Sequence, residues 1–258
     1  MVEACTPASA LSPGPRYATA VTTRIFLAGA SGAIGRPLTA MLVAAGFRVT
    51  GTSRTDAGAA TITAAGADAA IVDVFDAAGL TAAMRAGRPD VVIHMVTDLS
   101  TAPGTTLTDE QLARNAHVRE VGTRNLIAAA GATGARRLIA QSIAWLYMPG
   151  PEPHPEEDPI VPDGPGPIER NRLAVIDLER TVTTDPRFEG IVLRFGRLYG
   201  PGTWTPTPDT PPTVHVEAAA RAALLAVDHG EPGIYYIADD GGPVMTAKAR
   251  RLLGWEPG

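Results

Sequence analysis

The segment GASGAIG, which runs from Gly29 to Gly35, constrains the fold more than any other part of the sequence. It directly follows an apolar stretch, RIFLA (24–28), and opens a stretch with helical character at 34–45. In such a turn the first glycine lets the chain leave the strand sharply, the second lets the backbone approach a ligand closely, and the third lets the helix pack on the strand. The helix N-terminus then offers free N–H groups and the positive end of its dipole. The order of strand, glycine turn and helix therefore predicts a binding site for the pyrophosphate of a dinucleotide.

Short apolar segments alternate with helical ones along the rest of the chain. The apolar segments are nearly continuous, as expected for strands of a parallel sheet that is covered on both faces. Segment 110–130 has apolar residues near helical spacing and is expected to be one long helix. The alternation predicts an α/β fold with a Rossmann-type doubly wound parallel sheet of about seven strands. The expected strands are 24–28, 48–52, 69–74, 90–96, 136–142, 190–196 and 233–239.

Two proline-rich segments, 148–167 and 200–213, interrupt this alternation. Strand and helix resume after each of them, so we expect surface excursions of one domain, acting as lids or remaining disordered. The first 22 residues are rich in Pro, Ala and Ser and lack the basic start of a signal peptide. The predicted organisation is a disordered tail (1–22) and a single NAD(P)-binding domain (23–258), with substrate-binding elements from 148–170 and 200–258.

The composition excludes several kinds of partner. A net charge of −5 argues against nucleic acid, because nucleic-acid-binding proteins usually carry a basic face. No apolar run approaches the roughly 20 residues needed to span a bilayer, so no membrane partner is expected. Cys5 is the only cysteine, so no internal disulfide can form, and we expect a cytoplasmic location. The histidines are scattered, without the short spacing of zinc ligand pairs, so no metal site is predicted.

Further motifs occur in the order found in one large family. With its glycine spacing, the chain resembles the extended and atypical short-chain dehydrogenase/reductases, in particular the NAD-dependent epimerase/dehydratase group, over residues 23–258. The resemblance implies a nicotinamide cofactor, a small-molecule substrate and a homodimer to which helix 110–130 would contribute. The region after Gly202 is short for this family, which implies a small, shortened C-terminal substrate-binding part. The matching motifs are Asp73 in IVDVFD, VVIHMV (91–96), GTRNLIAAA (122–130), LRFGRLYGPGTW (193–204), TVHVEAAARAALLAV (213–227) and KARRLLGWEPG (248–258).

The end of the second strand predicts which dinucleotide binds. An NAD site of this kind usually has an acid about 20 residues past the glycines, where it binds the ribose 2′-hydroxyl. Here the strand ends in GTSR (51–54), and no acid occurs before Asp56. The planar cationic fork of Arg54 suits a 2′-phosphate, with the Ser53 hydroxyl and Arg36 beside it. NADP is therefore favoured over NAD as the cofactor.

The resemblance implies the remaining cofactor contacts. Asp73 would bind the adenine amino group, and the alternative is that it caps a turn. His94 would lie beside the cofactor ribose, and the alternative is a core histidine with its hydrogen bonds satisfied. The predicted cofactor-binding residues are Gly29, Ser31, Gly32, Ala33, Ile34, Gly35, Arg36, Ser53, Arg54, Asp73, Val74, His94 and Met95.

The helix IERNRLAVIDLER (168–180) lacks the residues on which the chemistry of this family normally rests. The resemblance implies a Tyr-x-x-x-Lys pair on one helix face, with tyrosine as general acid or base and lysine stabilising the phenolate. Aligned on Glu179, the tyrosine position is Asn171 and the lysine position is Val175. No other alignment restores the pair, because the chain has no tyrosine between positions 148 and 198 and its single lysine lies near the C-terminus.

A carbonyl reduction without this pair needs another proton donor. Tyr147, just past the fifth strand, is the first candidate, and its alternative role is aromatic packing under the proline-rich segment. Ser142 lies one residue before Ile143, the position where the family has serine or threonine. Asn171 cannot exchange protons usefully, but it can hydrogen-bond a ribose or a substrate oxygen. These three residues are the catalytic candidates, and Arg172 could bind an anionic group. Weaker candidates are Asp98, His154 and His215.

Three functions fit this sequence. The first is an NADP-dependent oxidoreductase that reduces a small carbonyl or enone with a non-standard proton donor. The second is a non-redox isomerase, cyclase or dehydratase on the same scaffold. The third is a non-catalytic NADP sensor. The fold alone does not choose among them.

Overall fold

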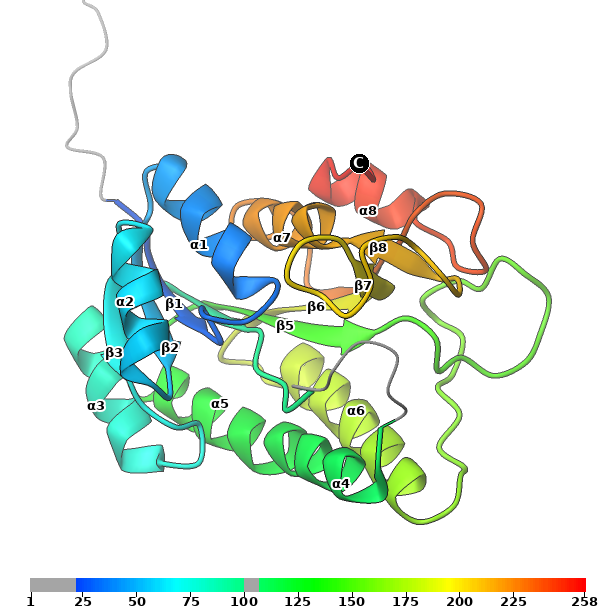
Figure 1. Cartoon of the computed structure of the whole chain (residues 1–258), viewed down its shortest axis with the longest axis horizontal. Helices are drawn as coiled ribbons and strands as arrows, with labels where there is room; N and C mark the ends of the chain where they lie inside the picture. Colours follow the sequence, from blue (N-terminus) through cyan, green and yellow to red (C-terminus); the bar gives the residue numbers. More distant parts are fainter. Residues whose placement is uncertain (1–21, 100–106) are drawn as a thin grey trace, which may run out of the picture.

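The computed structural model describes residues 22–99 and 107–258, in which a parallel sheet lies between two layers of helices (Figure 1). The sheet has seven strands in the order β3-β2-β1-β4-β5-β6-β9, and every neighbouring pair is parallel. This confirms the predicted Rossmann-like α/β class. The strands are β1 (Arg24–Ala28), β2 (Arg48–Ser53), β3 (Asp68–Ile71), β4 (Val91–His94), β5 (Arg137–Ile143), β6 (Glu189–Phe195) and β9 (Gly233–Ile237).

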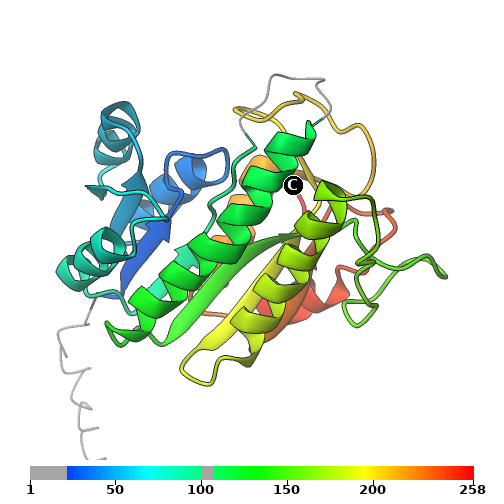
Figure 2. The same cartoon turned by 90° about the horizontal axis from the view of Figure 1, so that it is seen from below.

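Two apolar cores lie on the two faces of the sheet. Ile25 and Leu27 of β1 lie in the core beneath α1, α2, α7 and α8, whereas Phe26 and Ala28 lie in the core beneath α3, α5 and α6. Successive side chains of a strand point to opposite faces, so a strand that is covered on both sides must be apolar throughout. Figures 1 and 2 show α1 and α7 on one side of the sheet and α4, α5 and α6 on the other. The helices are α1 (Gly35–Ala44), α2 (Asp56–Ala64), α3 (Ala77–Gly87), α4 (Asp109–His117), α5 (Thr123–Gly131), α6 (Pro167–Thr184), α7 (Val216–Leu225) and α8 (Ala247–Leu253).

The long helix predicted at 110–130 is present, with an irregularity in its middle. It begins at a capping box, in which Thr108 and Gln111 satisfy each other's backbone N–H groups. Between α4 and α5 the residues Val118–Gly122 wind as a π-helix, η1. Such a turn shifts the side chains around the helix axis and often marks a functional position. Arg119 lies in this turn and is only 4 % exposed.

Two details of the strands differ from the prediction. β3 ends at Ile71 rather than at residue 74, because β3 is an edge strand and Asp73 turns the chain by accepting a hydrogen bond from the Phe75 N–H at 2.9 Å. A second, two-stranded parallel sheet was not predicted. It pairs β7 (Arg197–Tyr199) with β8 (Thr213–His215), so the two ends of the 200–213 segment lie side by side.

The first proline-rich segment packs against the loop that follows β9. Tyr147 forms a β-bridge with Ile160, and His154 forms one with Val244. The His154 N–H also donates to the Pro243 carbonyl at 2.8 Å. The predicted tail at 1–22 lies outside the described residues apart from Thr22. Within the described ranges, no helix is long and apolar enough to cross a membrane.

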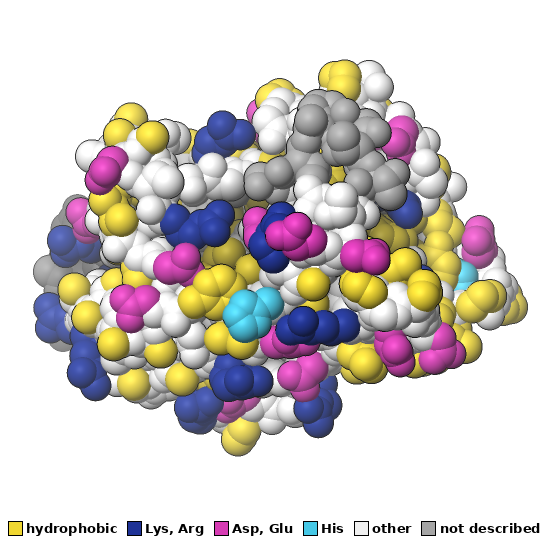
Figure 3. All heavy atoms as spheres, turned by 60° about the horizontal axis from the view of Figure 1, so that its bottom comes forward, with side chains coloured by type: hydrophobic (Ala, Val, Ile, Leu, Met, Phe, Trp, Pro, Cys, Tyr) yellow, Lys and Arg dark blue, Asp and Glu magenta, His cyan; other side chains and the backbone are white. Residues whose placement is uncertain are grey.

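The outer face of α4, α5 and α6 carries interleaved acidic and basic side chains, as Figure 3 shows. Several of them form ion pairs, such as Arg170 with Glu120 at 2.7 Å and Arg114 with Glu110 at 2.9 Å. Exposed pairs of this kind contribute little to stability. The homodimer expected to use this long helix remains a prediction.

Candidate functional site

The glycine turn has the geometry that its sequence predicts. Gly29 adopts a φ of +86°, a backbone conformation that favours glycine. A Cβ on Gly29 would lie 2.9 Å from the backbone of Met95, and a Cβ on Gly35 would lie 2.1 Å from the Gly29 carbonyl oxygen. The Gly32 N–H closes the turn by donating to that same oxygen at 3.0 Å. Side chains at Gly29 or Gly35 would therefore push apart β1, α1 and the end of β4.

This turn lies where the strand order reverses. β1 pairs with β2 on one side and with β4 on the other. Ligands of doubly wound sheets bind at the carboxyl ends of the strands at such a switch point. The first turn of α1 has neither an acidic residue nor a side-chain cap, and within the described ranges no backbone carbonyl accepts the N–H groups of Ala33 or Ile34. Free donors at a helix N-terminus fit a diphosphate.

Two arginines without an ion pair flank this turn. Arg54 follows β2 and is exposed, and Ser53 beside it lies 3.4 Å from the Ser31 hydroxyl. Arg36 is also exposed, and its guanidinium occupies the space that a side chain at Gly202 would need. Neither arginine forms a salt bridge with any residue that the structure describes. Both are therefore free to meet a phosphate group.

Asp73 and Val74 lie where the chain turns after β3. The Asp73 carboxylate caps this turn through the Phe75 N–H, which is the alternative role that the sequence left open. The Val74 carbonyl accepts a hydrogen bond from Asn125 Nδ2 at 2.9 Å, and this ties the turn to α5. The contact between Asp73 and the adenine amino group remains a prediction.

His94 is a core histidine, which corrects its assignment as a cofactor ligand through the side chain. The ring is 2 % exposed. Nδ1 accepts the Val96 N–H at 3.3 Å, so Nε2 carries the proton and donates to the Thr123 hydroxyl at 3.0 Å. Burial, and to a smaller extent the positive charge of Arg119, lowers the pKa of His94 to about 4. The ring is therefore neutral at pH 7 and has no free nitrogen.

Asn171 lies at the centre of a buried polar chain between α4 and α6. Its Oδ1 accepts hydrogen bonds from Arg119 Nη1 at 2.6 Å and from Asn115 Nδ2 at 3.4 Å. Asn115 in turn accepts the Asp98 N–H through its own Oδ1 at 3.1 Å. Burial lowers the pKa of Arg119 to about 10, and its guanidinium stays charged at pH 7. The structure thus brings the predicted Asn171 together with Asn115 and Arg119, which the sequence analysis missed.

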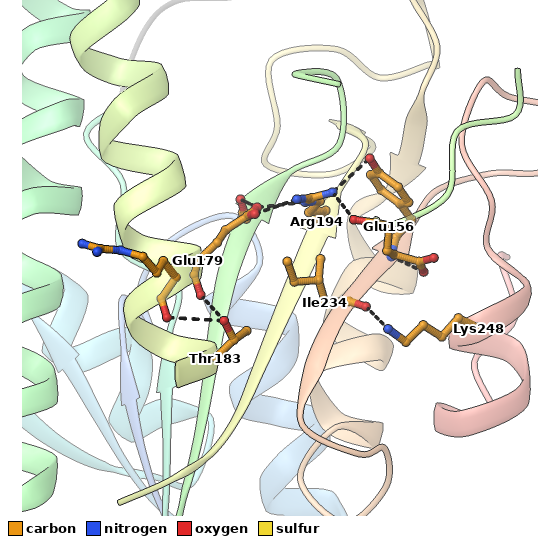
Figure 4. A network of polar contacts seen from close by, with 9 residues as sticks. Glu156, Glu179, Thr183, Arg194, Ile234 and Lys248 are labelled. Atoms are coloured by element: carbon orange, nitrogen blue, oxygen red, sulfur yellow. Dashed lines mark hydrogen bonds and ion pairs between the residues drawn. The ribbon is translucent and has the colours of Figure 1, made fainter. Parts of the chain in front are cut away.

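Ser142 belongs to a different network, shown in part in Figure 4, and this corrects its assignment as a proton donor. The side chain is 2 % exposed, and its hydroxyl donates to Glu179 Oε1 at 2.6 Å. Glu179 also accepts two hydrogen bonds from Arg194, at 2.9 and 2.7 Å, and Arg194 donates to the Tyr236 hydroxyl at 3.1 Å. Burial lowers the pKa of Arg194, but the hydrogen bonds and charges of Glu179 and Tyr236 together outweigh this and leave the pKa raised. The hydrogen of Ser142 is therefore committed to a structural carboxylate.

Tyr147 packs over the edge of the sheet instead of at the switch point. Its ring stacks on His154, with centroids 3.9 Å apart, and contacts the small core that includes Tyr236 of β9. Burial raises the pKa of the Tyr147 hydroxyl. Because β9 is the edge strand and three strands separate it from β1, the packing role that was the alternative for Tyr147 fits the structure better than proton donation.

The weaker candidates all have partners of their own. The Asp98 N–H donates to Asn115 and so belongs to the network around Asn171, and the Asp98 carboxylate pairs with Arg114 at 3.1 Å. Within the described ranges, no group of three or more His, Cys, Asp or Glu residues could hold a metal ion. The other contacts are Arg172 to the Asp163 carbonyl, His154 to Asp158 at 2.7 Å, and His215 to the Glu217 N–H at 3.4 Å.

Comparison with known proteins gives one family and one curated relative. The family model described as the NAD-dependent epimerase/dehydratase family matches residues 25–226. A 3-diazoavenalumate denitrifying reductase from a Streptomyces species is 36 % identical over 277 residues, which cover 90 % of this chain and 88 % of that protein.

Solved structures with the same fold include two sugar-nucleotide epimerases. The UDP-glucose 4-epimerase of Thermotoga maritima, solved with UDP-glucose, has a TM-score of 0.75 and 18 % identity over 90 % of this chain and 93 % of that one. The UDP-glucose 4-epimerase of Thermus thermophilus, solved with NAD, has a TM-score of 0.68 and 22 % identity over 92 % of this chain and 86 % of that one. At this level of identity the two structures support the fold alone.

Proposed function

This chain belongs to the NAD-dependent epimerase/dehydratase family as an SDR-like, nicotinamide-dependent oxidoreductase, and we propose that it reduces a diazo group on a small aromatic acid, with NADPH as reductant and dinitrogen as leaving group. The name of the Streptomyces relative supports the substrate class, because it states a diazo carboxylate, a loss of nitrogen and a reduction. The same name favours a redox function over an isomerase or a sensor. Sugar nucleotides are not proposed, because the structures that bind them share only the fold with this chain.

Diazo reduction differs from carbonyl reduction in its need for protons. A carbonyl takes a hydride on carbon and a proton on oxygen, so its site needs a proton donor. An aryl diazonium ion takes a hydride only. The electron pair of the hydride forms the new C–H bond, the C–N bond breaks, and its electron pair leaves on dinitrogen, so that atoms and charge balance. A bound NADPH would supply the hydride.

One observation carries this proposal: the position where the family keeps its acid is held by an amide that cannot act as one. Asn171 has its carbonyl oxygen bonded to Arg119 and Asn115. The nearby His94 is neutral, with both ring nitrogens bonded, and Ser142 donates its hydrogen to Glu179. Among the described residues, none of these groups is free to give a proton to the substrate. Such a site suits an acceptor that needs no proton at the reacting carbon.

The cofactor that we propose is NADP. Arg54 and Arg36 lie on either side of the glycine turn and form no ion pair with the residues in 22–99 and 107–258, and β2 ends in a serine instead of an acid. A 2′-phosphate would supply the negative charge that could pair with both arginines. The cytoplasmic location and the homodimer expected from the sequence stay predictions.

The test uses the full chain under anaerobic conditions with NADPH and the diazonium salt of 3-amino-4-hydroxycinnamate. We expect NADPH consumption, followed by its absorbance, to match dinitrogen release in a ratio of about one to one, as the balanced reaction requires. 4-Hydroxycinnamaldehyde serves as the carbonyl comparison, and heat-denatured protein controls for spontaneous reduction. Oxidation of NADPH with the aldehyde but not with the diazonium compound would contradict the proposal.

A further inference from the structure

In the hydrogen-bonded network around Asn171, each group can take only one role, as donor or as acceptor. At one end the Asp98 N–H can only donate, so Asn115 must present its Oδ1 to it and its Nδ2 to Asn171. At the other end the guanidinium of Arg119 can also only donate. Both neighbours therefore require the oxygen of Asn171, and no rotation of the amide satisfies them otherwise.

These roles leave the Nδ2 group of Asn171 to face away from both partners. The side chain is half-buried, in the second turn of α6, and within the described residues its two N–H donors have no acceptor. An amide N–H₂ group can donate but cannot protonate a ligand. The hydrogen-bonded network thus ends at the Nδ2 donor of Asn171, whose orientation Asn115 and Arg119 fix.

Arg119 adds a positive field to this donor. Its side chain is 4 % exposed, and the negative charge that acts on it comes from Glu179, which forms its ion pair with Arg194 at 2.7 Å and none with Arg119 among the described residues. A buried cation without an ion pair of its own is costly, and its desolvation is offset further when an anion binds nearby. The π-helical turn that directs Arg119 inward is part of the same arrangement. A positive charge one amide away from a free donor favours an anionic oxygen over a neutral hydroxyl.

We propose that Asn171 Nδ2 donates a hydrogen bond to an anionic oxygen of the substrate, a carboxylate or a phenolate of an aromatic acid, and that Arg119 is the positioning residue that orients this amide and supplies the compensating charge. The inference rests on the proposed function, and it names the part of the substrate that this site recognises. It also gives a positive role to the position where the family has tyrosine, because the amide holds the ligand without exchanging protons with it.

Binding to the protein in saturating NADP+ tests this without turnover. The probes for calorimetry are 4-hydroxycinnamate, its methyl ester, which lacks the carboxylate, and 4-methoxycinnamate, which lacks the phenolic hydrogen. We expect methylation at one end to weaken binding to the wild type by about tenfold or more, and that end identifies the oxygen at Asn171. Equal affinity for all three probes would overturn the inference.

Substitution of Asn171 assigns this preference to the amide. Asn171→Asp exchanges the donor for an acceptor while keeping its size, so we expect it to lose about tenfold in affinity for 4-hydroxycinnamate and little for the methylated probe. Asn171→Ser should lose the same discrimination if the aspartate variant does not fold. An equal loss for every probe would contradict the inference, and so would a loss of NADP+ affinity alone, because the amide would then serve the ribose.

Arg119 and a matched arginine complete the test. Arg119→Met should reduce the discrimination between 4-hydroxycinnamate and the methylated probe that binds more weakly, and Arg119→Lys should restore part of it. Arg180→Gln is the control, because Arg180 is exposed on α6 and its one ion pair among the described residues is with Asp177. Failure of the proposed function looks different: the wild type would discriminate between the probes but would not reduce the diazonium compound. If the protein reduces the diazonium compound but Asn171 variants bind the probes as the wild type does, this inference is overturned and the proposed function stands.

Discussion

The glycine turn follows the carboxyl end of β1, and the site around Asn171 includes Asp98, which follows the carboxyl end of the neighbouring β4. The two sites are built from different parts of the chain. The turn consists of backbone atoms from one continuous segment, and its fit depends on the lack of side chains at Gly29 and Gly35. The second site joins three separate segments: Asn115 and Arg119 of the α4–η1 helix donate to Asn171 Oδ1 on α6, and the Asp98 backbone N–H donates to Asn115 Oδ1. A backbone site allows little variation, whereas a side-chain site can be rebuilt when a facing helix supplies a new group. In this chain the first has kept the family pattern and the second has not.

The largest expected effect comes from breaking the backbone site. In Gly35→Ala the new Cβ would lie 2.1 Å from the Gly29 carbonyl oxygen, so the turn must open. We expect NADP+ affinity, measured by calorimetry, to fall by more than about 100-fold. Gly242→Ala is the control, because the nearest atom to its Cβ would be 3.6 Å away. Unchanged affinity in Gly35→Ala would mean that the diphosphate does not rest on this turn.

The buried histidine that feels the charge of Arg119 should show itself in the pH dependence of stability. His94 has a pKa of about 4 in the folded chain, against an ordinary value of 6.5. The unfolded chain therefore binds this proton first, and stability that is complete above pH 6.5 is lost as the pH falls from 6.5 to 4. We expect a loss on the order of 3 kcal/mol from this residue in urea unfolding.

The comparison with His94→Gln isolates this contribution, because other groups also titrate in this range. The variant should lose less stability than the wild type between pH 6.5 and 4. The matched control is His229→Gln, which replaces an exposed histidine and should behave as the wild type does. The same pH dependence in His94→Gln and the wild type would contradict the burial of a neutral ring.

A smaller effect is expected at the rim of the backbone site. Arg54→Ser removes the cation proposed for the 2′-phosphate, so NADP+ affinity should fall by about tenfold while NAD+ affinity changes by less than about twofold. Arg85→Ser, which replaces an exposed arginine of α3, should change neither. An equal loss for both dinucleotides would assign Arg54 to a part of the cofactor that they share.

The smallest effect is expected for Tyr147. Tyr147→Phe keeps the stacking on His154 and removes only the hydroxyl. If the ring serves packing, the kcat for diazonium reduction should change by less than about twofold. A fall of a hundredfold or more would support Tyr147 as a proton donor and would contradict the claim that it serves packing.

The sequence alone predicted most of the fold and the backbone site. Continuous apolar strands and the glycine spacing arise from local rules, and the seven-stranded parallel sheet follows from them. It did not predict β7 and β8, because strands of three residues carry almost no periodic signal. The role of Arg119 was also missed, because nothing local in the sequence distinguishes it from the exposed arginines of the same helix, such as Arg114.

The predictions at Ser142 and Tyr147 lacked the same kind of information. Both lie at or just past the end of β5, so their positions in the sequence fit a catalytic role. Their partners come from distant segments: Glu179 on α6 takes the Ser142 hydrogen, and His154 in the proline-rich segment stacks on Tyr147. Contacts between side chains so far apart in sequence have no local signal. Only the folded chain decides which polar group is free.

Isotope tracing gives the most direct test of the account, which holds that this site delivers a hydride to the substrate and no proton. The full chain is given the diazonium salt of 3-amino-4-hydroxycinnamate with NADPH deuterated at C4 in ordinary water, and then with ordinary NADPH in deuterium oxide. We expect deuterium at the carbon that carried the diazo group in the first experiment and none at that carbon in the second. Deuterium that enters this carbon from the solvent would contradict the account, because the site would then have to supply a proton.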